Sequence, residues 1–381
     1  MDTGFVWGGF EGASHRRLVD LGRVDSVASS GHERWAYLDH ALLRSLGMRC
    51  ARESLRWHLI ERVPGVYDFT SALQQVRAAK AAGVAVVWGI CHWGLPDHID
   101  VWSAEFPQLL AAFAKAVARM LREEGSDIAG WVPVNEMAFW AWAGGATGGF
   151  HPFHTLRGDF LKWQLVLGHL AVVQALRGNG AFEPIMVCEP LIMVHAQEGS
   201  GGAVARGYMQ ASTAAIEWIL AADSSAIDVI GWNFYPHNQW REDDTRVPRG
   251  DPHYRPLRNL LHDVAKRFGR PLVLSETGAE EPDGVGWLSY VAAEAEAALQ
   301  MGVPLRAICI YPVTDYAGWD NARHCECGPI GSREGRRFVR EWHRQLIEQL
   351  SVLDVRCPAR PADDPFAAGA GSTARMKFSS D

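Results

Sequence analysis

Short apolar runs alternate with longer segments of helical period along most of the chain. Eight runs of strand length end at or near Gly, Asn, Glu or Pro, as strands that lead into loops commonly do. Between them, apolar residues recur at i, i+3 and i+4, the period of a helix with one buried face. The expected strands span residues 5–9, 48–53, 84–91, 129–135, 184–189, 226–234, 271–276 and 306–312. This alternation predicts repeated βα units.

The number of units favours a closed barrel. Helices are expected at residues 37–46, 106–121, 160–176, 257–268, 287–301 and 337–350, and the last of these follows the eighth strand. An open, doubly wound sheet would show the same alternation, but no Gly-rich phosphate-binding loop follows the first strand. We therefore expect an α/β fold in which residues 1–350 form a single (β/α)8 TIM barrel.

Two segments depart from this pattern. Residues 351–381 are rich in Pro, Ala, Gly and Ser, a composition that predicts a disordered C-terminal tail. Residues 237–255 are polar, charged and contain proline, and are expected to form a long loop after the sixth strand. In a barrel, loops at this end of the strands build the active face.

Composition narrows the class of partner and the compartment. With 48% hydrophobic and 21% charged residues, the 381-residue chain is expected to fold into a globular domain. A net charge of −7 without a Lys/Arg cluster predicts neither a nucleic-acid nor a membrane partner. The seven cysteines are odd in number and scattered, and no secretion signal or stretch of about 18 apolar residues is found, so a cytoplasmic location is expected.

Two glutamates stand at the ends of predicted strands. Glu136 closes the fourth strand in WVPVNE, and Glu276 closes the seventh in LVLSET. Strands four and seven lie nearly opposite each other in an eight-stranded ring, so the two carboxylates would face one pocket. Glycoside cleavage needs such a pair. Each glutamate alone also fits a structural interpretation, as an acid at a helix N-terminus or as part of a local turn.

Several short motifs carry a resemblance to a known family. They are PVNEM at residues 133–137, LSETG at 274–278, CARESLRW at 50–57, CHWGLP at 91–96 and WNFY at 232–235. Together they resemble clan A glycoside hydrolases, and most closely a compact family 1 β-glucosidase-type enzyme. The resemblance implies that Glu136 is the general acid/base and Glu276 the nucleophile. It departs where that family usually has Pro in place of Met137, and Thr-Glu-Asn-Gly in place of the string around Glu276.

The resemblance also implies supporting roles. Arg52 would hydrogen-bond the nucleophile, Tyr235 would touch it, and His92 would contact the sugar. Arg52 would keep Glu276 ionised through a charge-assisted hydrogen bond, its alternative being a structural ion pair. From its position, Asn135 is expected to donate to the sugar 2-hydroxyl. The alternative for Tyr235 is a packing role at the barrel rim. The alternative for His92 is a core histidine whose hydrogen bonds are satisfied within the protein.

Substrate recognition is where the chain departs most from this family. His15 in EGASH stands where a sugar-binding Gln is usual, and the stretch after strand eight reads TDYAGWDN. The carboxylate that grips a sugar hydroxyl would then come from Asp315 or Asp320. Trp93 and Trp319 are expected to stack on sugar faces.

These observations predict a retaining exo-β-glycosidase, β-glucosidase-like, that acts on a small β-glycoside or glycosylated metabolite and that transglycosylates when an acceptor outcompetes water. The alternatives are an endo-acting clan A hydrolase and a non-catalytic sugar-binding barrel. The segment at residues 140–153 is long enough to wall off one side of the pocket, which favours exo action. No cofactor or metal is expected, and His324-Cys325-Glu326-Cys327 is a weak metal motif without a second cluster. The glycone and the oligomeric state are left open.

Overall fold

Eight parallel strands form one sheet in the computed structural model, which describes residues 2–319, 321, 323–356 and 366. The strands follow the order β4-β3-β2-β1-β10-β9-β7-β5. They are β1 (Val6–Gly9), β2 (Cys50–Ser54), β3 (Ala85–Cys91), β4 (Ile128–Val134), β5 (Met186–Pro190), β7 (Val229–Asn233), β9 (Leu272–Thr277) and β10 (Leu305–Ile310). Each overlaps one of the eight predicted strands.

The sheet closes between its two outermost strands. Parallel bridges join Trp131 to Ile185 and Asn135 to Cys188, and the backbone N–H of Glu136 donates to the carbonyl of Cys188 at 3.0 Å. The prediction of a single (β/α)8 TIM barrel is therefore confirmed. Closure brings the carboxyl ends of all eight strands to one rim, which is where side chains for chemistry collect in this fold.

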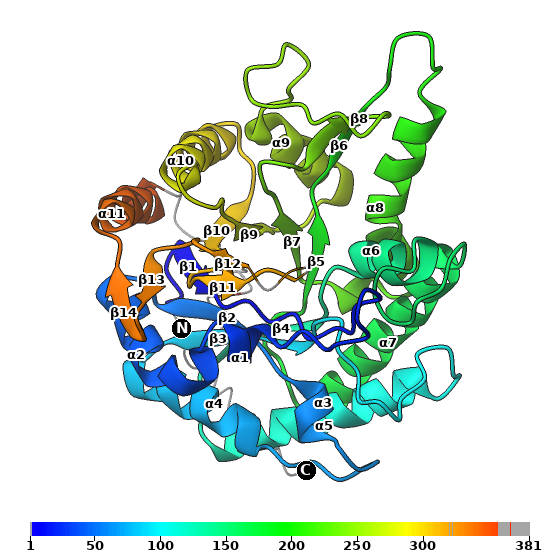
Figure 1. Ribbon diagram of the computed structural model, residues 1–381, viewed down its shortest axis with the longest axis vertical. Helices are drawn as coiled ribbons and strands as arrows, with labels where there is room; N and C mark the ends of the chain where they lie inside the picture. Colours follow the sequence, from blue (N-terminus) through cyan, green and yellow to red (C-terminus); the bar gives the residue numbers. More distant parts are fainter. Residues whose placement is uncertain (1, 320, 322, 357–365, 367–381) are drawn as a thin grey trace, which may run out of the picture.

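Long helices surround the strands, as Figure 1 shows. They are α2 (His32–Ser45), α4 (Thr70–Ala82), α5 (Phe106–Glu123), α7 (Gly158–Gly178), α8 (Ala203–Ala222), α9 (Leu257–Phe268), α10 (Gly284–Gln300) and α11 (Glu341–Arg356). Helix α5 illustrates why they form here, because its side chains Leu110, Phe113, Val117 and Leu121 are all fully buried at helical spacing. Short elements after strands β1, β2 and β4 add to the rim: α1 (Ser26–Ser29), α3 (Trp57–Ile60), α6 (Met137–Trp140) and the π-helical turn η1 (Ala141–Ala146). The 3-10 turn η2 (Ser224–Ala226) lies between α8 and β7.

Side chains of the strands pack into two cores, one inside the barrel and one between barrel and helices. Trp7, Val87, Val132 and Val273 are buried in the inner core, whereas their neighbours in sequence point toward the helices. This alternation follows from the two-residue period of a strand. It assigns consecutive strand residues to different environments, which matters below for Arg52 and Glu53.

The loop expected at residues 237–255 contains a short strand. Within it, β8 (Gln239–Arg241) pairs in parallel with β6 (Met193–His195). Two further pairs of short strands follow the barrel: β11 (Tyr316–Ala317) with β12 (His324–Cys325), and β13 (Ile330–Arg333) with β14 (Arg336–Val339). Sequence patterns missed these because two to four residues are too few to show a period.

The predicted tail began at residue 351, but α11 continues to Arg356. Phe366 is buried, and its ring meets that of Trp7 edge-on with centroids 5.2 Å apart. Residues 357–365 and 367–381, which make up the rest of the predicted tail, lie outside the described residues. Among the described helices, none is long and apolar enough to cross a membrane.

Candidate active site

The two predicted catalytic glutamates lie at the carboxyl ends of their strands. Glu276 belongs to β9, and Glu136 lies two residues after the end of β4. Both side chains are buried, with 4% and 8% of their surface exposed. Glu136 has a left-handed backbone, with φ 43° and ψ 63°. That conformation is uncommon for a residue other than glycine, and such strain gathers at functional sites.

Glu276 is held by two donors on different oxygens. The guanidinium Nη1 of Arg52 lies 3.0 Å from Oε1, and the hydroxyl of Tyr235 donates to Oε2 at 2.8 Å. Burial raises the pKa of Tyr235 and the charge of Glu276 adds to the shift, so the phenol remains a donor. Arginine stays charged in proteins. Each oxygen of the Glu276 carboxyl group therefore accepts a hydrogen bond, one of them from a charged guanidinium.

Glu136 lies in a contrasting environment. Its pKa is raised well above the usual value, first by burial and then by the negative charge of Glu276. One amide hydrogen bond, from Asn233 Nδ2 to Oε1 at 2.8 Å, opposes this shift. Ser275 orients that amide by donating to Asn233 Oδ1 at 2.6 Å. The two carboxyl groups thus lie in contrasting environments, as an acid and a nucleophile require.

A chain of hydrogen bonds runs from Arg52 to the third strand. Arg52 Nη2 donates to Asn135 Oδ1 at 3.0 Å, so the Asn135 amide nitrogen faces His92 Nε2 at 3.1 Å. Burial lowers the pKa of His92 well below its usual value, so the ring is neutral. Nε2 then accepts from Asn135, and Nδ1–H donates to Ser54 Oγ at 3.2 Å. Both ring nitrogens of His92 are thus engaged, and a sugar hydroxyl would have to displace Asn135 to reach it.

The predicted sugar-binding aromatic residues form one cluster. The His15 ring stacks on Phe150 with centroids 3.7 Å apart and meets Trp93 and Trp319 edge-on at 5.7 and 5.8 Å. Trp93 is anchored to the catalytic rim, because its Nε1–H donates to the carbonyl of Asn135 at 2.9 Å. Within the described part of the chain, neither ring nitrogen of His15 nor the Trp319 indole nitrogen has a hydrogen-bond partner. The cluster therefore keeps unused polar atoms beside the catalytic strands.

Asp315 does not fit its predicted role as a sugar ligand. It is 1% exposed, and both carboxylate oxygens are occupied. Backbone N–H groups of Cys327 and Ser332 donate to it at 2.9 and 2.8 Å, and Arg340 pairs with it at 3.0 Å. Four hydrogen bonds from protein groups leave little capacity for a hydroxyl. Asp315 instead fastens the loop after β10 to the segment that follows, while Asp320, the alternative ligand, lies outside the described residues.

Sequence reasoning missed two buried polar residues near the two glutamates. Asn233 lay within the quoted WNFY motif, but nothing local linked its amide to Glu136. Glu11 follows the first strand and is buried, and its carboxylate accepts from the Ala13 N–H at 2.9 Å and the Tyr311 hydroxyl at 3.4 Å. Burial and the charge of Glu276 raise its pKa to about 8. The position of Glu11 just after the first strand was the signal in the sequence that could have identified it.

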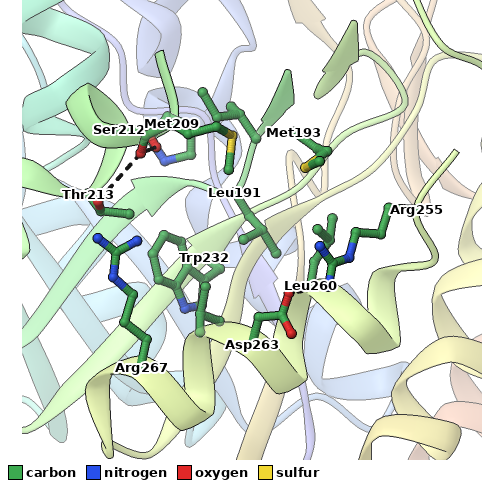
Figure 2. Close-up of a pocket in the computed structure, with 13 residues that line it drawn as sticks. Leu191, Met193, Met209, Ser212, Thr213, Trp232, Arg255, Leu260, Asp263 and Arg267 are labelled. Atoms are coloured by element: carbon green, nitrogen blue, oxygen red, sulfur yellow. Dashed lines mark hydrogen bonds and ion pairs between the residues drawn. The ribbon is translucent and has the colours of Figure 1, made fainter. Parts of the chain in front are cut away.

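A separate cavity of about 160 Å³ lies outside the barrel, between α8, α9 and β6 (Figure 2). It is lined mainly by apolar side chains, including Leu191, Met193 and Trp232, with Arg255, Asp263 and Arg267 among its polar lining. None of the predicted site residues lines it. It is therefore separate from the predicted active site.

The weak metal motif at His324 to Cys327 does not assemble into a ligand set. The only group with metal-like spacing among the described residues is His32, His40 and Glu53, elsewhere in the barrel. The described cysteines are all free and buried. Cys357 lies outside the described residues.

Comparison with known proteins identifies the fold. No family model matches the sequence, and no curated protein matches it. The structure resembles the family 1 β-glucosidase from Thermotoga maritima, with a TM-score of 0.73, 17% identity, and coverage of 92% of this chain and 98% of that one. That enzyme in complex with glucoimidazole gives a TM-score of 0.73 at 16% identity, with the same coverage. The AHE enzyme from Alicyclobacillus herbarius gives 0.74 at 18%, covering 91% and 98%. The chain thus shares the complete (β/α)8 barrel of a family 1 β-glucosidase.

Proposed function

We propose that this protein is a retaining exo-β-glycosidase that hydrolyses a small β-glycoside or glycosylated metabolite. The observation that carries the proposal is the contrast between its two buried glutamates. Arg52 and Tyr235 donate hydrogen bonds to the two oxygens of Glu276, whereas burial and the charge of Glu276 favour a protonated Glu136. A retaining glycosidase needs one carboxylate nucleophile and one carboxylic acid. The shared barrel with a family 1 β-glucosidase supports the same assignment.

In the first step, a Glu276 oxygen attacks the anomeric carbon and forms an ester bond to it. The bond from that carbon to the leaving oxygen breaks, and Glu136 gives its proton to that oxygen, so an alcohol departs. As the ester forms, the negative charge of Glu276 disappears. One cause of the raised pKa of Glu136 then vanishes, so its carboxylate form, which must accept a proton in the next step, is favoured.

In the second step, water attacks the anomeric carbon of the glycosyl-enzyme. Glu136 takes the proton from that water, the ester bond breaks, and Glu276 returns to its carboxylate form between Arg52 and Tyr235. An alcohol or sugar in place of water would give transglycosylation by the same proton transfers. The Asn135 amide is placed beside the nucleophile by Arg52 and would donate to the sugar 2-hydroxyl after leaving His92.

Exo action is supported by what covers the rim. After Glu136 the chain continues into α6 and η1, and Phe139 and Phe150 from this region contact Trp319 with ring centroids 6.3 and 6.2 Å apart. Trp319 comes from the loop after β10, so two loops meet over the aromatic cluster. A rim closed on this side favours a pocket over an open cleft, and a pocket accepts one terminal sugar.

The test is mass spectrometry of the intact protein after incubation with 2-deoxy-2-fluoro β-glycosides that carry a good leaving group. The fluorine slows breakdown of the glycosyl-enzyme, so one sugar should remain bound per chain, and peptide mapping should place it on Glu276. The sugar that reacts identifies the glycone. Glu276→Ala should form no adduct, whereas Glu136→Ala should still label, because a good leaving group needs little acid assistance.

Azide provides an independent check of the assignment. In Glu276→Ala, added azide should restore turnover and yield a glycosyl azide of inverted configuration, because the anion replaces the missing nucleophile. In Glu136→Ala, azide should yield the retained product. The opposite pattern would exchange the two roles, and absence of labelling and hydrolysis across the panel would favour a non-catalytic barrel. Products cut from within an oligosaccharide would favour endo action.

A further inference from the structure

A second cluster of chemically active side chains lies outside the barrel interior, and the mechanism does not use it. It consists of His32 and His40 on α2 and Glu53 on β2, and all three side chains are fully enclosed. Glu53 follows Arg52 in the strand. Because successive strand residues point to opposite faces, Arg52 enters the catalytic pocket while Glu53 faces α2 and α4. We call these three residues the His32–His40–Glu53 cluster.

The cluster has three potential metal-ligand atoms that lie close together. Nε2 of His32 lies 3.0 Å and Nε2 of His40 lies 2.8 Å from Glu53 Oε1. The potential ligand atoms all lie within 4.8 Å of one another. Zinc bonds to imidazole nitrogen and carboxylate oxygen of about 2.0 to 2.1 Å place neighbouring ligand atoms roughly 3.3 Å apart in a tetrahedron. Opening the present contacts by a few tenths of an ångström would therefore admit the ion.

Neighbouring polar side chains orient these three residues by hydrogen bonds, as the residues around a metal site orient its ligands. The Asp39 carboxylate lies 2.9 Å from His32 Nδ1, so Nε2 is the nitrogen left for a ligand bond. Gln75 Nε2 donates to Glu53 Oε2 at 2.7 Å, which leaves Oε1 directed at the histidines. Asp39 is itself paired with Arg337 at 2.8 Å. A carboxylate behind a ligating histidine is the usual way in which proteins fix its orientation and raise its basicity.

Phe10 packs against both histidines. Its ring stacks on His32 with centroids 3.7 Å apart, and it meets His40 edge-on at 5.2 Å. In the part of the chain that the structure describes, His40 Nδ1 has no hydrogen-bond partner. The His40 ring is therefore engaged only through Nε2, the atom that faces Glu53.

We propose that the His32–His40–Glu53 cluster is a structural zinc site that ties α2 to β2. Two imidazole nitrogens and one carboxylate oxygen suit zinc, with a water completing the coordination. The site is separate from the catalytic pocket, and its metal would take no part in glycoside cleavage. It would brace the strand that carries Arg52 from the opposite face of the sheet.

The competing explanation is a metal-free ion-pair network. Burial lowers the pKa of His32, but the charges of Glu53 and Asp39 outweigh it and raise the pKa to about 9. A protonated His32 would satisfy the two carboxylates without an ion. The two explanations differ in one measurable respect, which is whether the purified chain retains one equivalent of zinc.

The test is to load the purified full chain with zinc, dialyse it against metal-free buffer and measure zinc per chain by plasma mass spectrometry. We expect one equivalent. X-ray absorption at the zinc edge should show nitrogen and oxygen neighbours at about 2.0 to 2.1 Å and no sulfur at about 2.3 Å. This measurement uses the unaltered protein, so it stands even if a variant fails to fold.

Variants then locate the site. His40→Ala and Glu53→Gln should lose the retained zinc, and Gln75→Leu should bind it about 10- to 100-fold more weakly, as outer-shell changes commonly do. The matched control is the double variant Cys325→Ser/Cys327→Ser, which removes the weak His324–Cys327 motif and should keep one equivalent. No zinc retained by the unaltered chain, sulfur neighbours in the spectrum, or loss of zinc in the cysteine control would each overturn the proposal.

Discussion

The hydroxyl of Tyr235 lies 2.8 Å from Oε2 of Glu276, on the carboxylate oxygen that Arg52 leaves free. Arg52 holds the other oxygen at 3.0 Å. Glu276 is therefore held from two sides, by Tyr235, which follows β7, and by Arg52 in β2. This arrangement predicts how each contact contributes to catalysis.

Tyr235→Phe should lower kcat/KM about 10- to 100-fold, since a hydrogen bond to a charged group is worth about 1.5 to 3 kcal/mol. The barrel should remain folded because the ring is kept. Steady-state kinetics on aryl β-glycosides measure the effect, with Tyr37→Phe as a control, because Tyr37 is exposed on α2. Unchanged kcat/KM in Tyr235→Phe would remove Tyr235 from the mechanism.

Activity should fall as pH rises through the pKa of Glu136, because only the protonated form donates to the leaving oxygen. The Asn233 amide favours the carboxylate, so it lowers that pKa. Asn233→Leu should therefore move the alkaline limb of the kcat/KM profile to higher pH. Its kcat/KM at the optimum should fall about tenfold, equivalent to roughly 1.4 kcal/mol.

Ser275→Ala supplies a graded comparison for the Asn233 prediction. It removes the hydroxyl that orients the Asn233 amide but leaves that amide in place. Its alkaline limb should move in the same direction by less. A shift of either variant to lower pH would contradict the assignment of Glu136 as the acid.

Glu11→Gln should flatten the pH dependence of stability. Burial raises the pKa of Glu11 from 4.5 to about 8, so the folded state binds a proton that the unfolded state releases between these values. Stability from this group is present below pH 4.5 and is lost as pH rises to about 8. Within this range, each pH unit lowers the free energy of unfolding by up to about 1.4 kcal/mol.

Urea unfolding of Glu11→Gln at several pH values measures this effect, with Glu348→Gln as an exposed control on α11. The Glu11 variant should lose less stability than the unaltered chain as the solution becomes alkaline. If the free energy of unfolding changes with pH equally in Glu11→Gln and in the unaltered chain, ionisation of Glu11 costs no stability.

Asp315→Asn should destabilise the fold by about 3 to 5 kcal/mol, because it leaves the buried Arg340 without its charged partner. KM should change less than twofold, since Asp315 has no free oxygen for a sugar. Asp315→Asn/Arg340→Met should recover part of the lost stability. A large rise in KM with unchanged unfolding energy would restore Asp315 as a sugar ligand.

Much of the fold was predictable from local pattern. Most barrel strands lie in apolar runs with a clear boundary, although β2 reads CARES, and eight strands of four to seven residues between helical segments indicate closure. The pairs β6/β8 and β13/β14 were not predictable. They contain only three or four residues per strand, and their pairing depends on contacts between distant segments.

The positions of Glu136 and Glu276 followed from the sequence, because a strand end in a parallel barrel has only one rim to face, whereas Arg52 was singled out by the resemblance of its motif. What those residues contact was decided by the tertiary structure. The Asn233 bond to Glu136 joins residues 97 positions apart. The saturation of Asp315 by Arg340, and the meeting of His32 and His40 with Glu53, likewise exist only after helices and loops have packed against the barrel. Strand period and strand ends are local properties, whereas hydrogen-bond partners, burial and hence protonation depend on long-range packing.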